Sequence, residues 1–423
     1  MPSVDCVDSA ALQASRGEPA LRVLAAIELG GHWGHLLRIK PVLDALRERG
    51  HAGALATSDA ASAGRLLEGE PIDIHACPSL RLTHPPPRGA RYRHYAQILD
   101  LCAFGDDAVL ASNVRQWIAL IGRARPDVLL TDFSPLALFV AHLARLPAVQ
   151  IPIGWEAPRH GEPLPMLPPA QDEDRAPYDA LEATMLARLN RQCAAYRAPP
   201  LRRLSDIYAI GTQLLACWPQ TDHFAPRAGA RYVGPIYSDG HGAPVRWPAA
   251  NRHRPRVFVY LAPGSREVAV LRALRNAEAD VIAVMPGLTP HVAESLCTPR
   301  LQVVEGPVRI GDALPQARLV ISNGGHGVIG ASLRSGVPML IVPRTAEQFM
   351  LARHLAGSGV AHLLAGASPD DLPALIMRML RDEDSLSAAK ALAAAHADRS
   401  LAQTLGDVVE AVERAGRPVA AQI

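Results

Sequence analysis

Cysteine pairs, an excess of charge of one sign and long apolar runs are all missing from this sequence. The 43 basic residues nearly balance the 41 acidic ones, so no general basic field argues for nucleic-acid binding. No run reaches the roughly 18 apolar residues that a membrane-spanning helix needs. The chain has six cysteines: Cys6, Cys77, Cys102, Cys193, Cys217 and Cys297. No two of them form a CxxC pair, so the sequence does not support a zinc site or thioredoxin-like chemistry.

The first twenty residues lack both a basic start and an apolar core, so they are not predicted to be a signal peptide. We expect a flexible extension there and a cytoplasmic protein with reduced thiols. Hydrophobic residues make up 49% of the chain, enough for a sizeable core. Lys40 and Lys390 are the only lysines, and this preference for arginine, with abundant alanine, is typical of a GC-rich bacterial genome.

Short apolar runs alternate with helical periodicity, which predicts α/β domains with parallel sheets. In the first half, strands are expected at residues 21–29, 52–57, 127–131, 148–153 and 207–217. The pattern restarts near residue 255, with strands expected at 256–262, 281–285, 301–304, 319–322 and 337–342. Two α/β domains in tandem should enclose a ligand cleft at the carboxyl ends of their strands.

The most informative segment places a glycine-rich turn between a strand and a helix. Gly324, Gly325 and Gly327 follow the predicted strand at 319–322. Glycines let a ligand approach the backbone, and a helix N-terminus offers unpaired N–H groups and a positive dipole end to a phosphate. The turn therefore predicts a phosphate or diphosphate site, with a helix cap that binds nothing as the alternative.

This segment resembles the nucleotide-sugar signature of family 1 glycosyltransferases. The matching positions are Gly324, Gly325, Gly327, Gly336, Val337, Pro338, Pro343, Glu347 and Gln348. The resemblance implies the α/β GT-B fold, in which two Rossmann-like α/β domains face each other across a cleft. It also implies a nucleoside-diphosphate sugar, of UDP or TDP, as co-substrate, with no cofactor and no metal. The donor contacts that it implies are Ser265, Asn323, Gly324, Gly325, His326, Gly327, Glu347 and Gln348, the last two facing the sugar.

Four positions depart from the family pattern. Asn323 stands where the family usually has a phosphate-contacting histidine, and Val328 stands where a hydroxyl residue usually meets the diphosphate. Ala331 and Leu351 replace a ribose-binding glutamate and an asparagine. His326 could supply a replacement phosphate contact, or it could be an exposed loop histidine.

His35 is the expected catalytic base. It lies at a helix N-terminus, where the dipole disfavours the imidazolium and a neutral ring can accept a proton. Residues 34–51 resemble the opening segment of the same family, with His35 in the register of the catalytic histidine and His32 as competing candidate. Asp132, at the end of a predicted strand, matches the aspartate that pairs with that histidine; a helix N-cap is the alternative. The glycines before His35 lack the GxGxxG spacing of a dinucleotide site.

The resemblance implies an inverting, metal-independent, hexosyltransferase-like enzyme acting on a small-molecule or lipid acceptor. Residues 21–235 would bind the acceptor and 253–395 the nucleotide sugar. These domains follow an extension at 1–20 and flank a linker at 236–252, and a helix within 396–423 should pack back on the first domain. Proline-rich loops near Arg91 and Trp155 could contact the acceptor. Peripheral membrane contact, the acceptor, the donor sugar and the oligomeric state stay open. The alternatives are a sugar-nucleotide epimerase, a non-catalytic nucleotide-binding or partner protein, and, less well supported, an NAD-dependent oxidoreductase.

Overall fold

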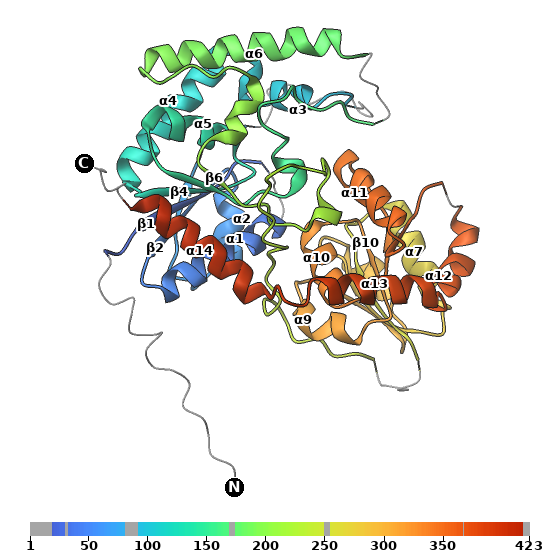
Figure 1. Cartoon of the computed structure of the whole chain (residues 1–423). Helices are drawn as coiled ribbons and strands as arrows, with labels where there is room; N and C mark the ends of the chain where they lie inside the picture. Colours follow the sequence, from blue (N-terminus) through green and yellow to red (C-terminus); the bar gives the residue numbers. More distant parts are fainter. Residues whose placement is uncertain are drawn as a thin grey trace.

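Two six-stranded parallel sheets form the framework of the chain (Figure 1). The computed structural model describes residues 19–29, 33–80, 92–168, 174–248, 254–366 and 368–417. The expected N-terminal extension lies almost wholly outside this part of the chain, as do His32 and Arg91. The prediction of two α/β domains with parallel sheets is confirmed.

The first sheet has the strand order β3-β2-β1-β4-β5-β6. Its strands are β1 (Arg22–Ile27), β2 (Ala52–Thr57), β3 (Asp73–Ala76), β4 (Val128–Asp132), β5 (Ala148–Gln150) and β6 (Thr212–Gln213). Its helices are α1 (Trp33–Glu48), α2 (Ala60–Leu66), α3 (Ala96–Asp100), α4 (Asp107–Ala124), α5 (Pro135–Ala144) and α6 (Ala176–Ala195). Alternate residues of β1 enter two different apolar clusters, because successive side chains of a strand point to opposite faces and both faces are covered. We call this the first unit.

The second sheet has the order β12-β11-β10-β7-β8-β9. Its strands are β7 (Arg256–Tyr260), β8 (Asp280–Val284), β9 (Leu301–Val304), β10 (Leu319–Ser322), β11 (Met339–Ile341) and β12 (Ala361–Leu363). The helices that follow are α7 (Ser265–Arg275), α8 (Pro290–Leu296), α9 (Ile310–Ala313), α10 (His326–Arg334), α11 (Ala346–Gly357), α12 (Leu372–Leu380) and α13 (Glu383–Ala395). We call this the second unit.

The strand predicted at 207–217 is wrong over much of its length. Residues Leu204–Ala209 form a 3₁₀ helix, and only Thr212–Gln213 pair with β5. Between them, Gly211 has a φ of +76°, and a Cβ there would lie 2.1 Å from the carbonyl oxygen of Ala148. The apolar run is therefore interrupted by a turn that only glycine can make against the neighbouring strand.

The last helix, α14 (Leu401–Gly416), returns to the first unit. Figure 1 shows it, in red, lying beside α1. Val408 and Val412 are completely buried in the same apolar cluster as β1 and α1. Glu413 pairs with Arg49 at 2.9 Å and with His51 at 3.1 Å, both just beyond the end of α1. The first unit is thus completed by the end of the chain.

Two connections join the units and run close together. Thr404 of α14 donates a hydrogen bond to the carbonyl of Val233, 2.6 Å away. Arg334, at the end of α10, contacts both the carbonyl of Pro235 at 3.4 Å and the hydroxyl of Thr404 at 3.3 Å.

None of the helices in the described part of the chain combines the length and the apolar character that a membrane span requires.

Candidate active site

A cavity of about 750 Å³ opens between the two units, beyond the carboxyl ends of β1, β4, β5, β10 and β11. This is the position that parallel α/β sheets favour for ligands. The first unit supplies Leu29, Gly34, His35, Arg38, Leu80, Tyr92, Ile98, Leu101, Cys102, Phe133, Ile153, Trp155 and Glu156. The second unit supplies Gly325, His326, Gly327, Thr345, Ala346, Glu347 and Gln348, and Ile236 lies between the two walls.

The two walls differ in chemistry. The wall from the first unit is mostly apolar and aromatic, and Trp155 anchors it by stacking on Phe224 with ring centroids 6.2 Å apart. The wall from the second unit presents glycine backbone and polar side chains. The cavity can therefore hold an apolar group on one side and a polar, anionic group on the other.

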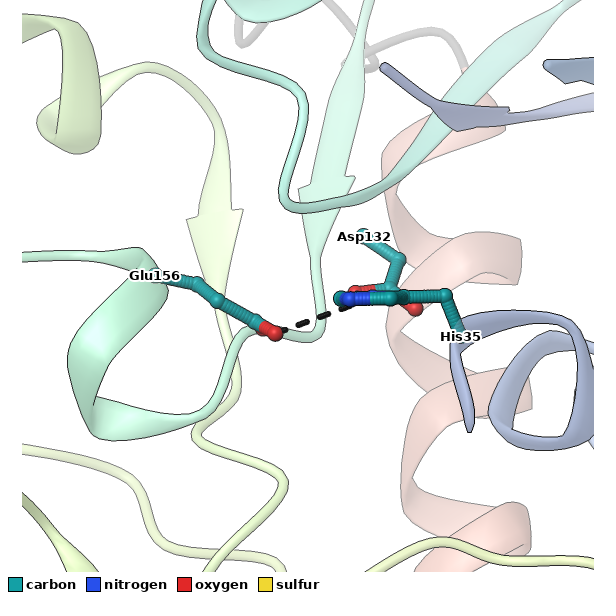
Figure 2. Close-up of side chains that lie close together, drawn as sticks. All are labelled: His35, Asp132 and Glu156. Carbon is teal, nitrogen blue, oxygen red and sulfur yellow. Dashed lines mark hydrogen bonds and ion pairs between the residues drawn. The ribbon is translucent and has the colours of Figure 1, made fainter. Parts of the chain in front are cut away.

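His35 lines the cavity, and its ring contacts the carboxylate of Asp132 (Figure 2). His35 lies in the first turn of α1, and Asp132 is the last residue of β4. The His35 Nδ1 atom is 3.2 Å from Asp132 Oδ1, and the carboxylate is fully buried while the imidazole is 19% exposed. A histidine held through Nδ1 by a buried carboxylate keeps Nε2 for a reacting group.

Arg38 and Glu156 complete a buried charged cluster around this pair. Arg38 lies one helical turn after His35 and donates from Nε to Asp132 Oδ2 at 3.0 Å. Its Nη2 atom contacts Asp132 Oδ1 as well, and lies 2.6 Å from Glu156 Oε1. Glu156, at the end of the 3₁₀ helix Gly154–Glu156, approaches His35 Nδ1 to 3.7 Å. The cluster thus holds two carboxylates, one guanidinium and one imidazole.

The electrostatics of the cluster correct one expectation from the sequence. Burial opposes a charge on His35, but the nearby Asp132 and Glu156 carboxylates outweigh it and raise the pKa of His35 above 6.5. The helix N-terminus was expected to lower the pKa of this ring, and the two carboxylates raise it instead. Burial raises the pKa of Glu156, whereas for Asp132 the Arg38 and His35 charges overcome burial and lower the pKa.

Three of these side chains have the spacing of a metal site. One atom each from His35, Asp132 and Glu156 lies within 4.8 Å of the others. However, the Arg38 guanidinium contacts both carboxylates, so a fixed cation already offsets part of their charge and occupies their oxygens. This arrangement fits a proton-transfer site better than a metal centre.

Phe133, the residue after Asp132, has a strained backbone. Its φ is +45°, a region that residues other than glycine rarely adopt and that costs on the order of 1–3 kcal/mol. The conformation brings its ring to 6.3 Å from the His35 ring, roughly parallel to it. Its carbonyl accepts a hydrogen bond from the amide of Leu29 at 3.2 Å. The turn therefore fixes the end of β4 against both His35 and the apolar wall.

The N-terminus of α10 faces the cavity from the second unit. Gly325, His326 and Gly327 line it, and the first amides of a helix have no partner within the helix. His326 is half-buried, its Nε2 atom has no hydrogen-bond partner among the residues that the structure describes, and burial lowers its pKa well below 6.5. A neutral His326 and these amides form a polar surface opposite His35.

Three of the expected donor contacts do not reach the cavity. The Asn323 amide is engaged inside the second unit: it accepts from Ala262 at 2.7 Å and donates to Glu267 at 3.2 Å and to the Val342 carbonyl at 2.8 Å. Gly324 has a φ of +92° and forms the turn behind the cavity. Ser265 is exposed at the start of α7 and is not part of the lining.

The departures from the family pattern are core residues. Val328, Ala331 and Leu351 are all buried in one apolar cluster of the second unit. None of them lines the cavity. In this chain, these three side chains therefore contribute to the core of the second unit.

Glu347 and Gln348, in the first turn of α11, do line the cavity. Gln348 accepts a hydrogen bond from the Arg344 amide at 2.8 Å, which fixes the side chain. Glu347 lies 3.4 Å from His223 of the first unit. Trp155, expected near the acceptor, also lines the cavity, 9% exposed.

The sequence patterns did not identify Arg38, Glu156 and His223 as residues of the site. A signal existed for Arg38, since it shares a helix face with His35 and with the buried Ile39, where a charged residue is out of place. Glu156 and His223 lie in irregular segments, whose path no periodicity predicts.

Comparison with known proteins relates the chain to enzymes of sugar transfer. A family model described as glycosyl transferase family 1 matches residues 22–154. Over 377 residues, the chain is 26% identical to a zeaxanthin glucosyltransferase from Pseudescherichia vulneris, covering 83% of this chain and 88% of that protein.

Solved structures are similar over almost the whole chain. The glycosyltransferase VinC in complex with dTDP has a TM-score of 0.66 at 19% identity, covering 93% of this chain and 100% of that one. The spinosyn rhamnosyltransferase SpnG, complexed with spinosyn aglycone, has a TM-score of 0.66 at 20% identity and covers 92% and 100%. These likenesses show a shared fold.

Proposed function

Because the chain belongs to glycosyltransferase family 1 and has the GT-B fold, we propose that it is an inverting glycosyltransferase. It moves a sugar from a nucleoside diphosphate to a hydroxyl group of an apolar small molecule. The observation that carries this proposal is the position of the His35–Asp132 pair, which lies between an apolar wall and a helix N-terminus.

His35 acts as the general base. Its Nε2 atom takes the proton from the acceptor hydroxyl, and Asp132, 3.2 Å from Nδ1, stabilises the imidazolium that forms. The acceptor oxygen then attacks the anomeric carbon on the face opposite the diphosphate, which inverts that centre. The raised pKa of His35 fits this role, because it makes the ring a stronger base.

The second unit binds the donor. The nucleoside diphosphate leaves toward Gly325–Gly327, where the amides and dipole of α10 offset its negative charge. Glu347 and Gln348 contact the sugar hydroxyls from α11. Asn323 holds the turn after β7 by accepting a hydrogen bond from the Ala262 amide, and neither Asn323 nor Ser265 lines the cavity.

The first unit binds the acceptor. Ile98, Leu101 and Phe133 are among the apolar residues of its wall, and such a surface selects a hydrophobic molecule that carries a hydroxyl group. The relatives agree in this respect, since one is a zeaxanthin glucosyltransferase and another was solved with a spinosyn aglycone.

Thermal unfolding in the presence of UDP, TDP, GDP or NAD tests the nucleotide site. A ligand at 100 times its Kd stabilises the folded state by about 2.7 kcal/mol. We expect a raised Tm with one nucleoside diphosphate and none with NAD. The absence of any shift would favour a non-catalytic homologue.

The His35→Ala variant tests the chemistry. We expect kcat to fall by about 10²–10⁴-fold, the usual contribution of a general base, while the Tm shift with the nucleotide persists. Unchanged turnover in this variant would overturn the assignment. Conversion of the donor without any acceptor would instead identify a sugar-nucleotide epimerase.

A further inference from the structure

One nitrogen of Arg38 makes more contacts than it has hydrogens. Its Nη2 atom contacts Asp132 Oδ1, lies 2.6 Å from Glu156 Oε1, and lies 3.0 Å from His35 Nδ1. Nη2 carries two hydrogens and cannot accept a hydrogen bond, because arginine stays protonated. Carboxylates form the stronger, charge-assisted bonds with a guanidinium. The two hydrogens therefore go to Asp132 and Glu156, and none is left for His35.

The direction of the two Nη2 hydrogens determines which nitrogen of His35 carries the proton. With no hydrogen supplied by Arg38, Nδ1 keeps its own and donates it to Asp132 Oδ1 at 3.2 Å. The Nε2 atom then bears the lone pair. At 3.7 Å from Nδ1, Glu156 Oε1 is too distant for a hydrogen bond, so Glu156 acts on His35 through Arg38.

We propose that Glu156 and Arg38 are positioning residues that set the tautomer of His35, and so decide which ring nitrogen can accept the proton of the acceptor. This inference rests on the proposed role of His35 as the base. If Glu156 is removed, the second Nη2 hydrogen of Arg38 is free to point at His35 Nδ1. It then stabilises the tautomer with the proton on Nε2, which cannot take a proton from a hydroxyl.

Glu156 is built into the fold in a way that suits this task. Its Oε2 atom accepts a hydrogen bond from the amide of Ile153 at 2.8 Å, so both carboxylate oxygens are fixed. The side chain is only 3% exposed, so water does not compete for the Arg38 hydrogen. Among the described residues, His326 of α10 faces the cluster and is neutral, because burial holds its pKa well below 6.5. Tyr95 and Cys217 lie near Glu156, and burial raises the pKa of both, so they stay protonated.

The tautomer is measured directly by NMR of the ¹⁵N-labelled imidazole rings, with His35→Ala used to assign the signal. The spectra are taken at a pH, found by titration, at which the ring is neutral. We expect a protonated Nδ1 in the unmodified protein. In Glu156→Ala we expect the proton on Nε2, and a kcat lower by about 10²-fold, near the lower end of a general base's contribution. The KM for the donor should stay within about twofold, because Glu156 lies on the acceptor side.

The Glu156→Gln variant provides the conservative comparison. Its one amide oxygen can accept from Arg38, and the Ile153 amide then loses its acceptor. We therefore expect the Nδ1–H tautomer and most of kcat to be retained in a less stable protein. Glu410→Gln, in an exposed pair with Arg414 on α14, is the matched control and should leave both the tautomer and kcat unchanged.

Two results would overturn the proposal: an Nε2–H tautomer in the unmodified protein, or an Nδ1–H tautomer in folded Glu156→Ala. If Glu156→Ala fails to fold, the unmodified protein and Glu156→Gln still test the proposal. An Nε2–H tautomer in either of these two proteins would contradict it. Failure of the proposed function is distinguishable, since it would appear as undiminished turnover in His35→Ala, whatever the tautomer.

Discussion

The imidazole of His223 in the first unit lies 3.4 Å from the carboxylate of Glu347 in the second unit. His223 is buried beside Trp155 of the acceptor wall, with ring centroids 5.8 Å apart. Glu347 lines the cavity on the donor side. This contact therefore links the two walls of the cavity directly.

Removing the His223 side chain should weaken donor binding. In His223→Ala, Glu347 loses its contact across the cavity, and we expect the donor KM to rise about two- to fivefold, as for a partly exposed pair. His223→Gln places an amide group near Glu347 that can donate a hydrogen bond to it, so its donor KM should stay within about twofold of that of the unmodified protein. Steady-state kinetics with varied donor concentration measures this, with the exposed His160→Ala as control. An unchanged donor KM in His223→Ala would mean that the contact does not position Glu347.

Shortening an apolar side chain of the acceptor wall should affect the acceptor alone. Ile98 of α3 is half-buried and lines the cavity. In Ile98→Ala the loss of three carbons should cost about 1–2 kcal/mol of acceptor binding, which raises the acceptor KM roughly five- to thirtyfold. The Tm shift with the nucleoside diphosphate should not change. Val109→Ala removes apolar carbons from a side chain that is 36% exposed on α4, outside the cavity, and should alter neither quantity. If Ile98→Ala weakened nucleotide binding as much as acceptor binding, the first unit would not bind the acceptor alone, and the proposed roles of the two walls would be wrong.

Glu28, just after β1, should make stability depend on pH. It accepts hydrogen bonds from Trp117 Nε1 at 2.6 Å and from the Leu136 amide at 2.9 Å, and burial raises its pKa from 4.5 to about 8. Between these values the unfolded chain releases the proton while the folded protein keeps it. The free energy of unfolding therefore falls as pH rises through this window, by on the order of a few kcal/mol, and levels off above it.

Urea unfolding at pH 5.5 and at pH 8 measures this effect. Glu28→Gln should flatten the difference between the two pH values, because the side chain no longer titrates. His35, whose raised pKa acts in the same direction, is present in both proteins, so the comparison isolates Glu28. Exposed Glu68→Gln should keep the full difference. A slope in Glu28→Gln as steep as in the unmodified protein would assign the pH dependence to another group.

A close approach between α10 and the connecting segment should make Gly330 intolerant of alanine. A Cβ at Gly330 would lie 2.4 Å from the Cβ of Pro235. We expect Gly330→Ala to lower the free energy of unfolding by about 1–3 kcal/mol, the usual cost of overpacking. Gly122→Ala, on α4 with nothing within 4 Å, should instead raise it by up to about 1 kcal/mol. Urea unfolding measures both free energies. Equal changes in the free energy of unfolding of the two variants would show that Pro235 can move away from an added Cβ at Gly330.

The framework could be predicted from sequence because its central strands are buried on both faces. Residues 52–57 and 319–322 form strands with the predicted bounds. The edge strand at 301–304 was also predicted, because its sequence LQVV is mostly apolar. The edge strands β3 and β12 were missed, because their short, half-exposed sequences carry no continuous apolar run.

The site was predictable only where regular structure carries it. His35 and Asp132 occupy a helix start and a strand end, and parallel topology brings such ends together. Glu156 depends on the path of an irregular segment after β5, which sequence periodicity does not describe. The direction of the His35 pKa shift could not be anticipated either, because it depends on burial and on the Asp132 and Glu156 carboxylates together.

The return of α14 to the first unit also concerns the order in which the chain is synthesised. Val408 and Val412 fill one face of the first sheet, yet nearly the whole second unit emerges from the ribosome before them. During translation, the apolar surface of α1 and β1 beneath them stays uncovered until α14 has left the ribosome. A protein cut between the units would carry that uncovered surface permanently, so its first half should aggregate alone and become soluble when the second half, with α14, is supplied.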